Sequence, residues 1–179
     1  MLLLLIRHAP ASARDAAAWP DDRQRPLSPR GERRFQPAAR GLRRIVRRPD
    51  TVLSSRYARA WRTAELLQQE AGWPAPLPCA ELEPGGTPVA ALDAVRRYAG
   101  QGADETSVLV GHEPLLSELA ALLLTGQPNG ASLLFKKGAA ACFEFLERPG
   151  DATQPGHRKS DAPRLLWLAQ PRLLRALAR

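Results

Sequence analysis

Short apolar runs that each end in a charged or polar residue recur along the chain. The first run, at 2–6, stops at Arg7 and His8, and a β-branched and apolar run at 106–110 is followed closely by His112. Runs of this length are typical of strands buried in a parallel sheet and are far too short to cross a membrane. Because ligands of open α/β sheets bind just beyond the carboxyl ends of the strands, these polar residues are candidates for one site.

The stretch after Arg25 predicts the first helix. Ser28 is placed to cap it and Pro29 to open it, whereas Pro37 removes a backbone donor and predicts a kink or a late start. Gly41 is expected to allow close packing on the sheet. The apolar spacing of three and four predicts that the helix buries Phe35, Ala38, Leu42 and Ile45.

The middle of the chain continues the alternation of strands and helices. A strand is predicted at 51–54, and the helix after it is expected to bury Ala60, Ala64, Leu67 and Ala71 and to end at Gly72. The segment 73–88, rich in proline and glycine, predicts an ordered loop. Further helices are predicted at about 89–98 and directly after Pro114.

The last third of the chain has a different pattern. Strands are predicted at 140–146 and 164–168, joined by a polar, mobile loop at 148–163 that contains His157. No role is assigned to His157, since an isolated histidine among polar turn residues is usually solvated. A short helix is predicted from Pro171.

Composition favours one globular domain over residues 1–179, because 44% of them are hydrophobic and no stretch suggests a second domain. The leading apolar run has no basic region before it and is shorter than the core of a secretory signal, so a cytoplasmic protein is expected. Cys79 and Cys142 form no ligand motif and are expected to be reduced, structural thiols.

The net charge of +8 is concentrated in residues 1–62, which hold 15 arginines against five acidic residues. Such a basic half attracts anions. A nucleic-acid surface is one explanation, but apolar residues interleave with the arginines at helical spacing, which favours the solvated face of an amphipathic helix. The arginines concerned are Arg40, Arg43, Arg44, Arg47 and Arg48.

The strand ends carry groups suited to phosphoryl transfer. A neutral imidazole such as His8 is a competent nucleophile near pH 7, and fixed cations stabilise the phosphoryl oxygens better than water. Arg7, Arg59 and His112 supply this charge from three separate junctions between a strand and a helix. Arg59 shares a predicted helix face with Arg56 and Arg62, which are expected to point with it toward the strand ends.

A metal site is the alternative use of the two histidines. Zinc bound by His8 and His112 would need a third ligand, for which the sequence has no obvious candidate. Neither a metal nor another cofactor is therefore expected.

Together, these residues resemble the histidine phosphatase superfamily, and within it the small phosphohistidine phosphatases of the SixA type. The resemblance covers most of the chain up to about Leu124. It also includes Lys136-Lys137-Gly138-Ala139 and the final strand and helix. The motifs that carry it lie in the family's order and are Leu5-Ile6-Arg7-His8, Arg25-Pro26-Leu27-Ser28-Pro29-Arg30-Gly31, the stretch 55–65, and Val110-Gly111-His112-Glu113-Pro114.

The resemblance implies a three-layer α/β/α sandwich like that of phosphoglycerate mutase, with a mostly parallel central sheet and an antiparallel edge. It implies that His8 becomes the phosphohistidine and that Arg7, Arg59 and His112 bind phosphate. Arg59, rather than its two neighbours, matches the family spacing Ser-x-x-x-Arg-Ala. Ala9 replaces the glycine of the common Arg-His-Gly motif, which leaves the chemistry intact.

The family's proton donor is usually a carboxylate between the pocket arginine and the second histidine. Glu81 fits this place best and Glu83 is the second candidate, although either glutamate could simply be exposed.

The resemblance also bears on the substrate. Larger relatives insert a helical lid between the pocket arginine and the second histidine, whereas one short loop and one helix separate Arg59 from His112. A shallow pocket suits phosphohistidine on a phosphotransfer domain of another protein better than an enclosed sugar phosphate. The alternatives are a small-molecule phosphomonoesterase and a non-catalytic module that binds phosphate or nucleic acid.

Overall fold

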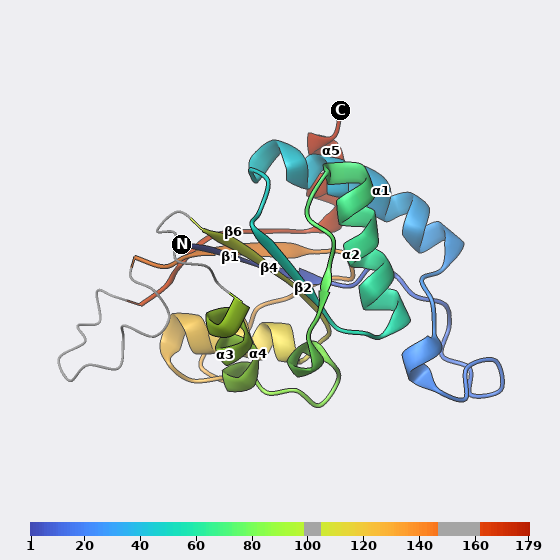
Figure 1. The fold of residues 1–179 in the computed structure, drawn as a ribbon, viewed down its shortest axis with the longest axis horizontal. Coiled ribbons are helices and arrows are strands. Elements are labelled where there is room, and N and C mark those ends of the chain that lie inside the picture. The colour runs from blue at the N-terminus through green and yellow to red at the C-terminus, as the bar shows by residue number, and fades with distance from the viewer. Residues whose placement is uncertain (99–104, 147–161) are drawn as a thin grey trace.

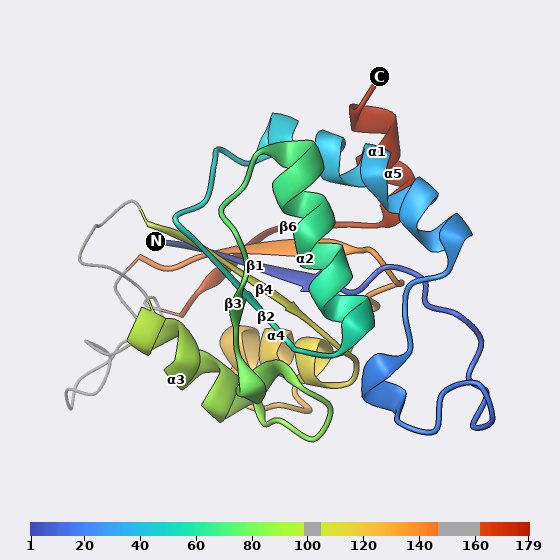
Figure 2. The ribbon, with the colours of Figure 1, turned by 45° about the vertical axis from the view of Figure 1, so that its right-hand side comes forward.

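The protein is a three-layer α/β/α sandwich in its computed structural model, which describes residues 1–98, 105–146 and 162–179. A six-stranded sheet has α1, α2 and α5 on one face and α3 and α4 on the other (Figures 1 and 2). This is the fold class that the sequence predicted. The helices are α1 Pro29–Ile45, α2 Ala58–Ala71, α3 Pro88–Tyr98, α4 Leu115–Thr125 and α5 Pro171–Leu177, with short 3-10 turns at Asp22–Gln24 and Ala80–Leu82.

The strand order is β3-β2-β4-β1-β5-β6, and the first four strands along the chain are parallel. β5 runs antiparallel to β1, and β6 runs antiparallel to β5, so the edge beyond β1 is the antiparallel one. The strands are β1 Leu2–Arg7, β2 Thr51–Ser54, β3 Leu77–Pro78, β4 Thr106–Gly111, β5 Ala140–Glu144 and β6 Arg164–Ala169.

The segment predicted as a loop, 73–88, contains one element that the sequence did not reveal. β3 is only two residues long, so it shows no alternation of apolar and polar positions, and it pairs with the end of β2. The backbone N–H of Cys79 donates to the carbonyl of Ser54 at 2.9 Å and continues this pairing.

Helix α1 differs from its prediction in three details. The Ser28 hydroxyl accepts from the Gly31 N–H at 3.0 Å, and the helix runs from Pro29 through Pro37, so a late start was wrong. Ile45 is 41% exposed because it ends the helix, and the next residue, Val46, occupies the buried position instead. A Cβ at Gly41 would lie 1.9 Å from the carbonyl oxygen of Leu174, so this glycine permits packing on α5 rather than on the sheet.

The remaining predicted elements are present at their expected places. α2 buries its four predicted apolar residues and ends at Gly72, whose φ of 69° is the left-handed conformation that glycine adopts easily. α3, α4, β5, β6 and α5 match their predicted ranges to within two residues. The predicted loop at 148–163, with His157, lies outside the described residues except for its last two.

Alternation along β1 divides the core between the two faces of the sheet. Leu4 and Ile6 pack with α1 and α2, whereas Leu3 and Leu5 pack with α3 and α4. Full burial of each side chain contributes about 1.5–3 kcal/mol, so this strand is held firmly on both faces. Cys79 and Cys142 are unpaired and buried, as predicted. Within the described residues, every helix is too short or too polar to span a bilayer.

Candidate active site

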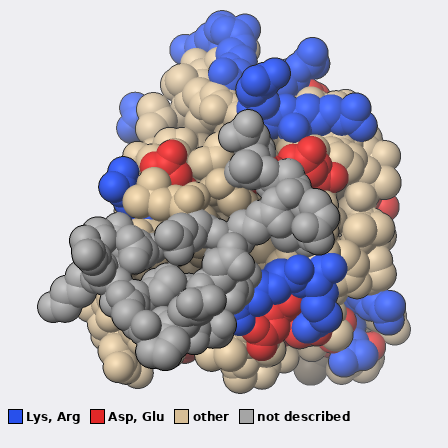
Figure 3. All heavy atoms as spheres, turned by 60° about the vertical axis from the view of Figure 1, so that its left-hand side comes forward, with Lys and Arg blue, Asp and Glu red and all other residues tan. Residues whose placement is uncertain are grey.

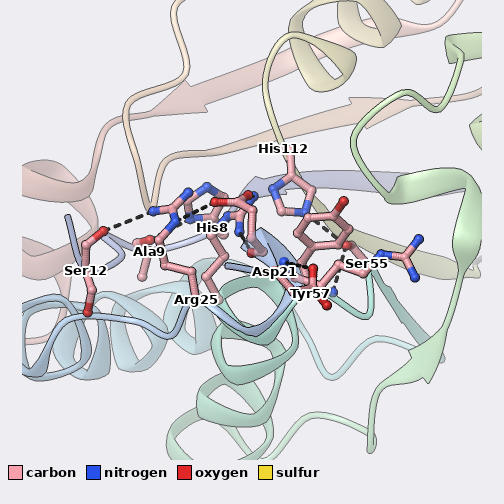
Figure 4. A network of polar contacts seen from close by, with 11 residues as sticks. His8, Ala9, Ser12, Asp21, Arg25, Ser55, Tyr57 and His112 are labelled. Atoms are coloured by element: carbon pink, nitrogen blue, oxygen red, sulfur yellow. Dashed lines mark hydrogen bonds and ion pairs between the residues drawn. The ribbon is translucent and has the colours of Figure 1, made fainter. Parts of the chain in front are cut away.

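Two neighbouring strands at the centre of the sheet bring His8 and His112 together. β1 and β4 are paired in parallel so that Arg7 lies opposite Gly111, and each histidine follows directly. The two imidazole rings lie 5.1 Å apart, centroid to centroid, and are tilted to each other (Figure 4). The chain leaves β1 toward α1 on one face and leaves β4 toward α4 on the other, and such a reversal between neighbouring parallel strands is where ligands bind in open α/β sheets.

His8 is held as a neutral imidazole. Its side chain is 6% exposed, and its Nδ1 lies 2.7 Å from the carbonyl oxygen of Ala9. A carbonyl can only accept, so Nδ1 carries the proton and Nε2 keeps its lone pair. Burial, followed by the positive charges of Arg59 and Arg7, lowers the pKa of His8 to about 3.

Arg59 lies in the first turn of α2 and is 4% exposed. Its Nη1 donates to the Asp22 carbonyl at 2.9 Å, and its Nη2 lies 3.0 Å from Asp22 Oδ2. The Nε–H of the same guanidinium is buried without a hydrogen-bond partner among the described residues. The edge formed by Nε and the second proton of Nη2 is therefore free to bind an anion.

Arg7 repeats this arrangement on the other side of the nucleophile. Its Nη1 donates to the carbonyl of Phe135 at 2.6 Å, and its Nε is again buried with no partner in the described part of the chain. Buried donors are nearly always satisfied in native proteins, so two such orphans beside one histidine indicate a site for an anion.

The other two arginines of this stretch do not join the site. Arg62 binds Glu32 and Glu65 at 3.0 and 3.1 Å, and Arg56 is exposed. The prediction that all three arginines point toward the strand ends was wrong, because Arg56 precedes the helix and Arg62 is held by two glutamates at the surface.

His112 is positioned by residues that follow β2. Its Nε2 forms a 2.9 Å hydrogen bond with the hydroxyl of Ser55, and the ring of Tyr57 packs edge-on at 5.2 Å between centroids (Figure 4). Burial and the charges of His8 and Arg59 lower the pKa of His112 to about 2. Both histidines are thus neutral across the physiological pH range.

Several supporting residues escaped sequence reasoning. Asp22 lies in a segment without periodicity, yet it joins Arg59 to Arg25, whose Nε lies 2.7 Å from Asp22 Oδ1. Hydrogen bonding from Arg25 and the charge of Arg59 lower the pKa of Asp22. Thr63 accepts the Ala9 N–H at 3.0 Å and donates to the Arg59 carbonyl at 2.7 Å, tying β1 to α2. Arg25 and Thr63 lie within recognised motifs, whereas Asp22 had no signal in the sequence.

Glu81 lies among residues that keep its carboxylate ionised. It accepts from the Cys79 thiol at 3.2 Å and pairs with Arg97. Its own backbone N–H, the Cys79 thiol and Arg97 lower its pKa. Glu83 forms an ion pair with Arg23 at 3.2 Å. No polar contact joins either glutamate to the histidines or to Arg7 and Arg59 within the described residues.

Glu113 is a different kind of glutamate. It follows His112, it is half-buried, and its Oε2 accepts from the Ser117 hydroxyl at 2.6 Å. Its Oε1 is buried without a partner in the part of the chain that the structure describes. Burial raises the pKa of Glu113, and Arg7 is among the charges that act on it. Over the same residues, no set of three His, Cys, Asp or Glu side chains is arranged to hold a metal ion.

Comparison with known proteins agrees with this arrangement. The family model of the histidine phosphatase superfamily (branch 1) matches residues 3–82. An uncharacterized protein of Picosynechococcus sp. is 35% identical over 137 residues, which cover 76% of this chain and 81% of the relative. An uncharacterized protein of Mycobacterium tuberculosis is 36% identical over 119 residues, covering 66% and 69% of the two chains.

Solved structures agree on the fold. The protein histidine phosphatase SixA complexed with tungstate has a TM-score of 0.75 at 23% identity, covering 96% of this chain and 97% of that one. SixA from Agrobacterium tumefaciens has a TM-score of 0.70 at 20% identity, covering 95% and 97%. A mycobacterial glucosyl-3-phosphoglycerate phosphatase has a TM-score of 0.65 at 16% identity, covering 92% and 96%. The chain belongs to the histidine phosphatase superfamily, whose enzymes act through a histidine nucleophile, and it shares the fold of the SixA-type members.

Proposed function

We propose that His8 is the nucleophile of this phosphatase and that its Nε2 attacks the phosphorus atom of the substrate. The observation that carries this proposal is the 2.7 Å contact between Nδ1 and the Ala9 carbonyl, which leaves the lone pair on Nε2. A pKa of about 3 keeps that lone pair available at neutral pH. The ring is also oriented before substrate arrives, which lowers the entropic cost of reaction.

The reaction has two displacements. First, Nε2 of His8 forms a bond to phosphorus while the bond to the leaving group breaks, and the leaving group takes the electron pair and a proton. Water then attacks the phosphorus atom and gives a proton to the acid that protonated the leaving group, while the bond from nitrogen to phosphorus breaks and its electron pair returns to Nε2. Inorganic phosphate leaves with His8 restored.

Arg7, Arg59 and His112 form the phosphate-binding set in this proposal. The unpaired Nε–H groups of both arginines supply donors for the phosphoryl oxygens. A neutral His112 supplies one ring N–H and adds no charge of its own. Fixed donors in a buried site stabilise the developing charge because they need no reorganisation during the reaction.

Glu113 is a better candidate for the proton donor than Glu81, the residue expected from the sequence. Glu81 was expected from the resemblance, but its own backbone N–H, the Cys79 thiol and Arg97 lower its pKa, which makes it a poorer proton donor. Glu113 has a raised pKa, a buried and unpaired oxygen, and a place directly after His112. We therefore place the donor at Glu113 and keep Glu81 as the alternative to be tested.

The proposed substrate is phosphohistidine on another protein. Between α2 and β4, the described residues form only β3, a 3-10 turn and α3, and α3 packs beside α4 on the face opposite α2. No helical lid covers the site within these residues, so a protein surface could approach the strand ends. A small phosphomonoester is the second candidate, since the fold is shared with a phosphatase of glucosyl-3-phosphoglycerate.

The test is a substrate panel measured as kcat/KM for the wild type and for His8→Ala. It contains a phosphohistidine protein, p-nitrophenyl phosphate and a set of sugar phosphates. We expect the highest kcat/KM with the phosphohistidine protein and no measurable turnover by His8→Ala, whose melting temperature should stay near that of the wild type. A marked preference for one sugar phosphate would overturn the proposed substrate. A folded His8→Ala enzyme that retains activity would overturn the proposed nucleophile.

A further inference from the structure

A hollow near the backbone of the nucleophile has an apolar floor, and five of its ten lining residues are cations. It has a volume of about 340 Å³ and lies between α1, the turn at 136–138 and the start of α5. Phe35 and Pro171 contribute apolar walls. We call it the basic cavity, after the five cations that line it: Arg34, Lys136, Lys137, Arg172 and Arg175.

The charge of the basic cavity is not compensated within the protein. No acidic residue lines it, and none of its five cations forms an ion pair within residues 1–98, 105–146 and 162–179. Burial and the charges of Arg34 and Arg172 lower the pKa of Arg175. These like charges repel one another, and a bound anion would relieve the repulsion.

The charge of the cavity continues a basic region of the surface. On another face of the molecule, Lys and Arg side chains gather at the end where α1 and α5 lie (Figure 3). A hollow lined by charges of one sign concentrates anions more strongly than scattered surface charges do.

The basic cavity is joined to the active site by the backbone. Pro10, which lines the basic cavity, is two residues after His8. The N–H of Gly138, another lining residue, donates to the carbonyls of Arg7 and His8, both at 3.1 Å. The turn at 136–138 therefore forms a wall of the basic cavity and supports the backbone of the nucleophile.

Lys137 connects the two regions electrostatically. Burial and the charges of Arg7, Arg25 and Arg59 lower the pKa of its ammonium group, and Lys137 is in turn one of the charges that lower the pKa of His8. An anion in the basic cavity and a phosphoryl group at His8 would thus share this lysine as a neighbour.

We propose that the basic cavity binds a second anionic group, a carboxylate or a phosphate, carried by the same substrate whose phosphoryl group reacts at His8. The proposal rests on the proposed function for the position of the first group. Acidic side chains beside a phosphohistidine and a second phosphate on a small molecule are the two sources of such a group.

The first arm of the test measures binding without catalysis. Two peptides carry phosphoryltriazolylalanine, a stable analogue of phosphohistidine, flanked by three glutamates in one and by three glutamines in the other. Calorimetry compares their affinities for the wild type and for the double variant Arg172→Gln/Arg175→Gln. The control is Arg47→Gln/Arg48→Gln, an equal charge change at exposed residues between α1 and β2, which line a different hollow together with Asp50 and Trp167.

We expect the wild type and the control to bind the glutamate peptide about threefold to tenfold more tightly than the glutamine peptide, the range for losing two partly exposed ion contacts. The Arg172→Gln/Arg175→Gln variant should bind both peptides equally and should hydrolyse p-nitrophenyl phosphate at the wild-type rate.

The second arm compares kcat/KM for fructose 1,6-bisphosphate and fructose 6-phosphate in the same three proteins. A preference for the bisphosphate that only Arg172→Gln/Arg175→Gln abolishes, without any peptide preference, identifies the second phosphate as the source. Absence of both preferences in the wild type, or their persistence in Arg172→Gln/Arg175→Gln, overturns the proposal. If the wild type hydrolyses none of the substrates but still prefers the glutamate peptide, the proposed function is refuted and the proposed role of the basic cavity is supported.

Discussion

Arg59 and Arg62 are one helical turn apart in α2, but they have opposite environments. Arg59 is 4% exposed, is held by Asp22, and keeps a buried Nε–H without a partner in the described structure. Arg62 is satisfied at the surface by Glu32 and Glu65. The same side chain thus keeps a free edge for an anion at one position and contributes an ordinary surface ion pair at the other.

The glutamates show the same contrast between an interior and a surface environment. Glu113 is half-buried with a raised pKa, whereas the surface partner Arg97 helps to keep Glu81 ionised. In both pairs, residue type and spacing identify the candidates. Burial then determines which of them has a shifted pKa or an unpaired polar group that can bind a ligand.

The largest expected effect comes from replacing Arg59 by lysine and comparing the result with the same replacement at Arg62. Lysine keeps the charge but has no planar edge of two N–H donors. For Arg59→Lys, kcat/KM should fall roughly tenfold to a thousandfold, the effect of losing one preorganised donor. Arg62→Lys should change kcat/KM by less than about twofold, as expected for a surface ion pair. Equal small effects that high salt abolishes would show that both arginines only attract anions.

Replacing each glutamate by glutamine should have a smaller effect that depends on the leaving group. With phenyl phosphate, whose phenolate is a poor leaving group, Glu113→Gln should lower kcat by about a hundredfold, the lower end of the range for general acid catalysis. With p-nitrophenyl phosphate, which departs without a proton, the loss should be slight. The matched change Glu81→Gln should leave both rates near wild type. The reverse pattern would assign the donor to Glu81.

The buried histidines should make stability fall in mild acid, which is the smallest of the three effects. Their pKa values in the folded protein, about 3 for His8 and about 2 for His112, lie below the ordinary value of 6.5. The unfolded chain therefore binds protons first, so the stability that neutral histidines contribute is complete above about pH 6.5 and is lost as the pH falls toward the folded values.

Urea unfolding between pH 7.5 and 5 measures this slope. Each histidine should contribute up to roughly 1.4 kcal/mol of unfolding free energy per pH unit. The measurement uses the Glu113→Gln background, because a carboxyl with a raised pKa contributes with the opposite sign. Adding His112→Gln should remove about half of the slope due to the two histidines. An unchanged slope would mean that folding does not lower the pKa of His112.

The elements that sequence reasoning located are those with long, repeated patterns. β1, β4 and α2 each bury a continuous row of apolar residues, and Arg7, His8, Arg59 and His112 are placed by where those rows end. Short or locally irregular features were missed. β3 has two residues, and Ile45 lies where the helix leaves the core, so neither obeys a periodic rule.

The missed parts of the site are contacts between segments distant in the chain. Asp22 meets Arg59 across 37 residues, and Ser55 meets His112 across 57. Nothing in the local sequence marks Asp22, and the motif that contains Ser55 does not reveal its partner, because both contacts exist only once the sheet has brought the two segments together. The five cations of the basic cavity likewise come from three separate segments of the chain and come together only in the fold.

The carboxylate of Asp22 has a consequence for how the enzyme operates in a cell. Inorganic phosphate is the product of a phosphatase, and it can bind again to the site from which it leaves. By occupying one side of Arg59, Asp22 offsets part of the positive charge that would otherwise retain any small anion. We expect the resting site to bind free phosphate weakly, so that each turnover ends in prompt release. On this view, Asp22 limits inhibition by the product, and selectivity for the substrate comes from contacts beyond the phosphoryl group.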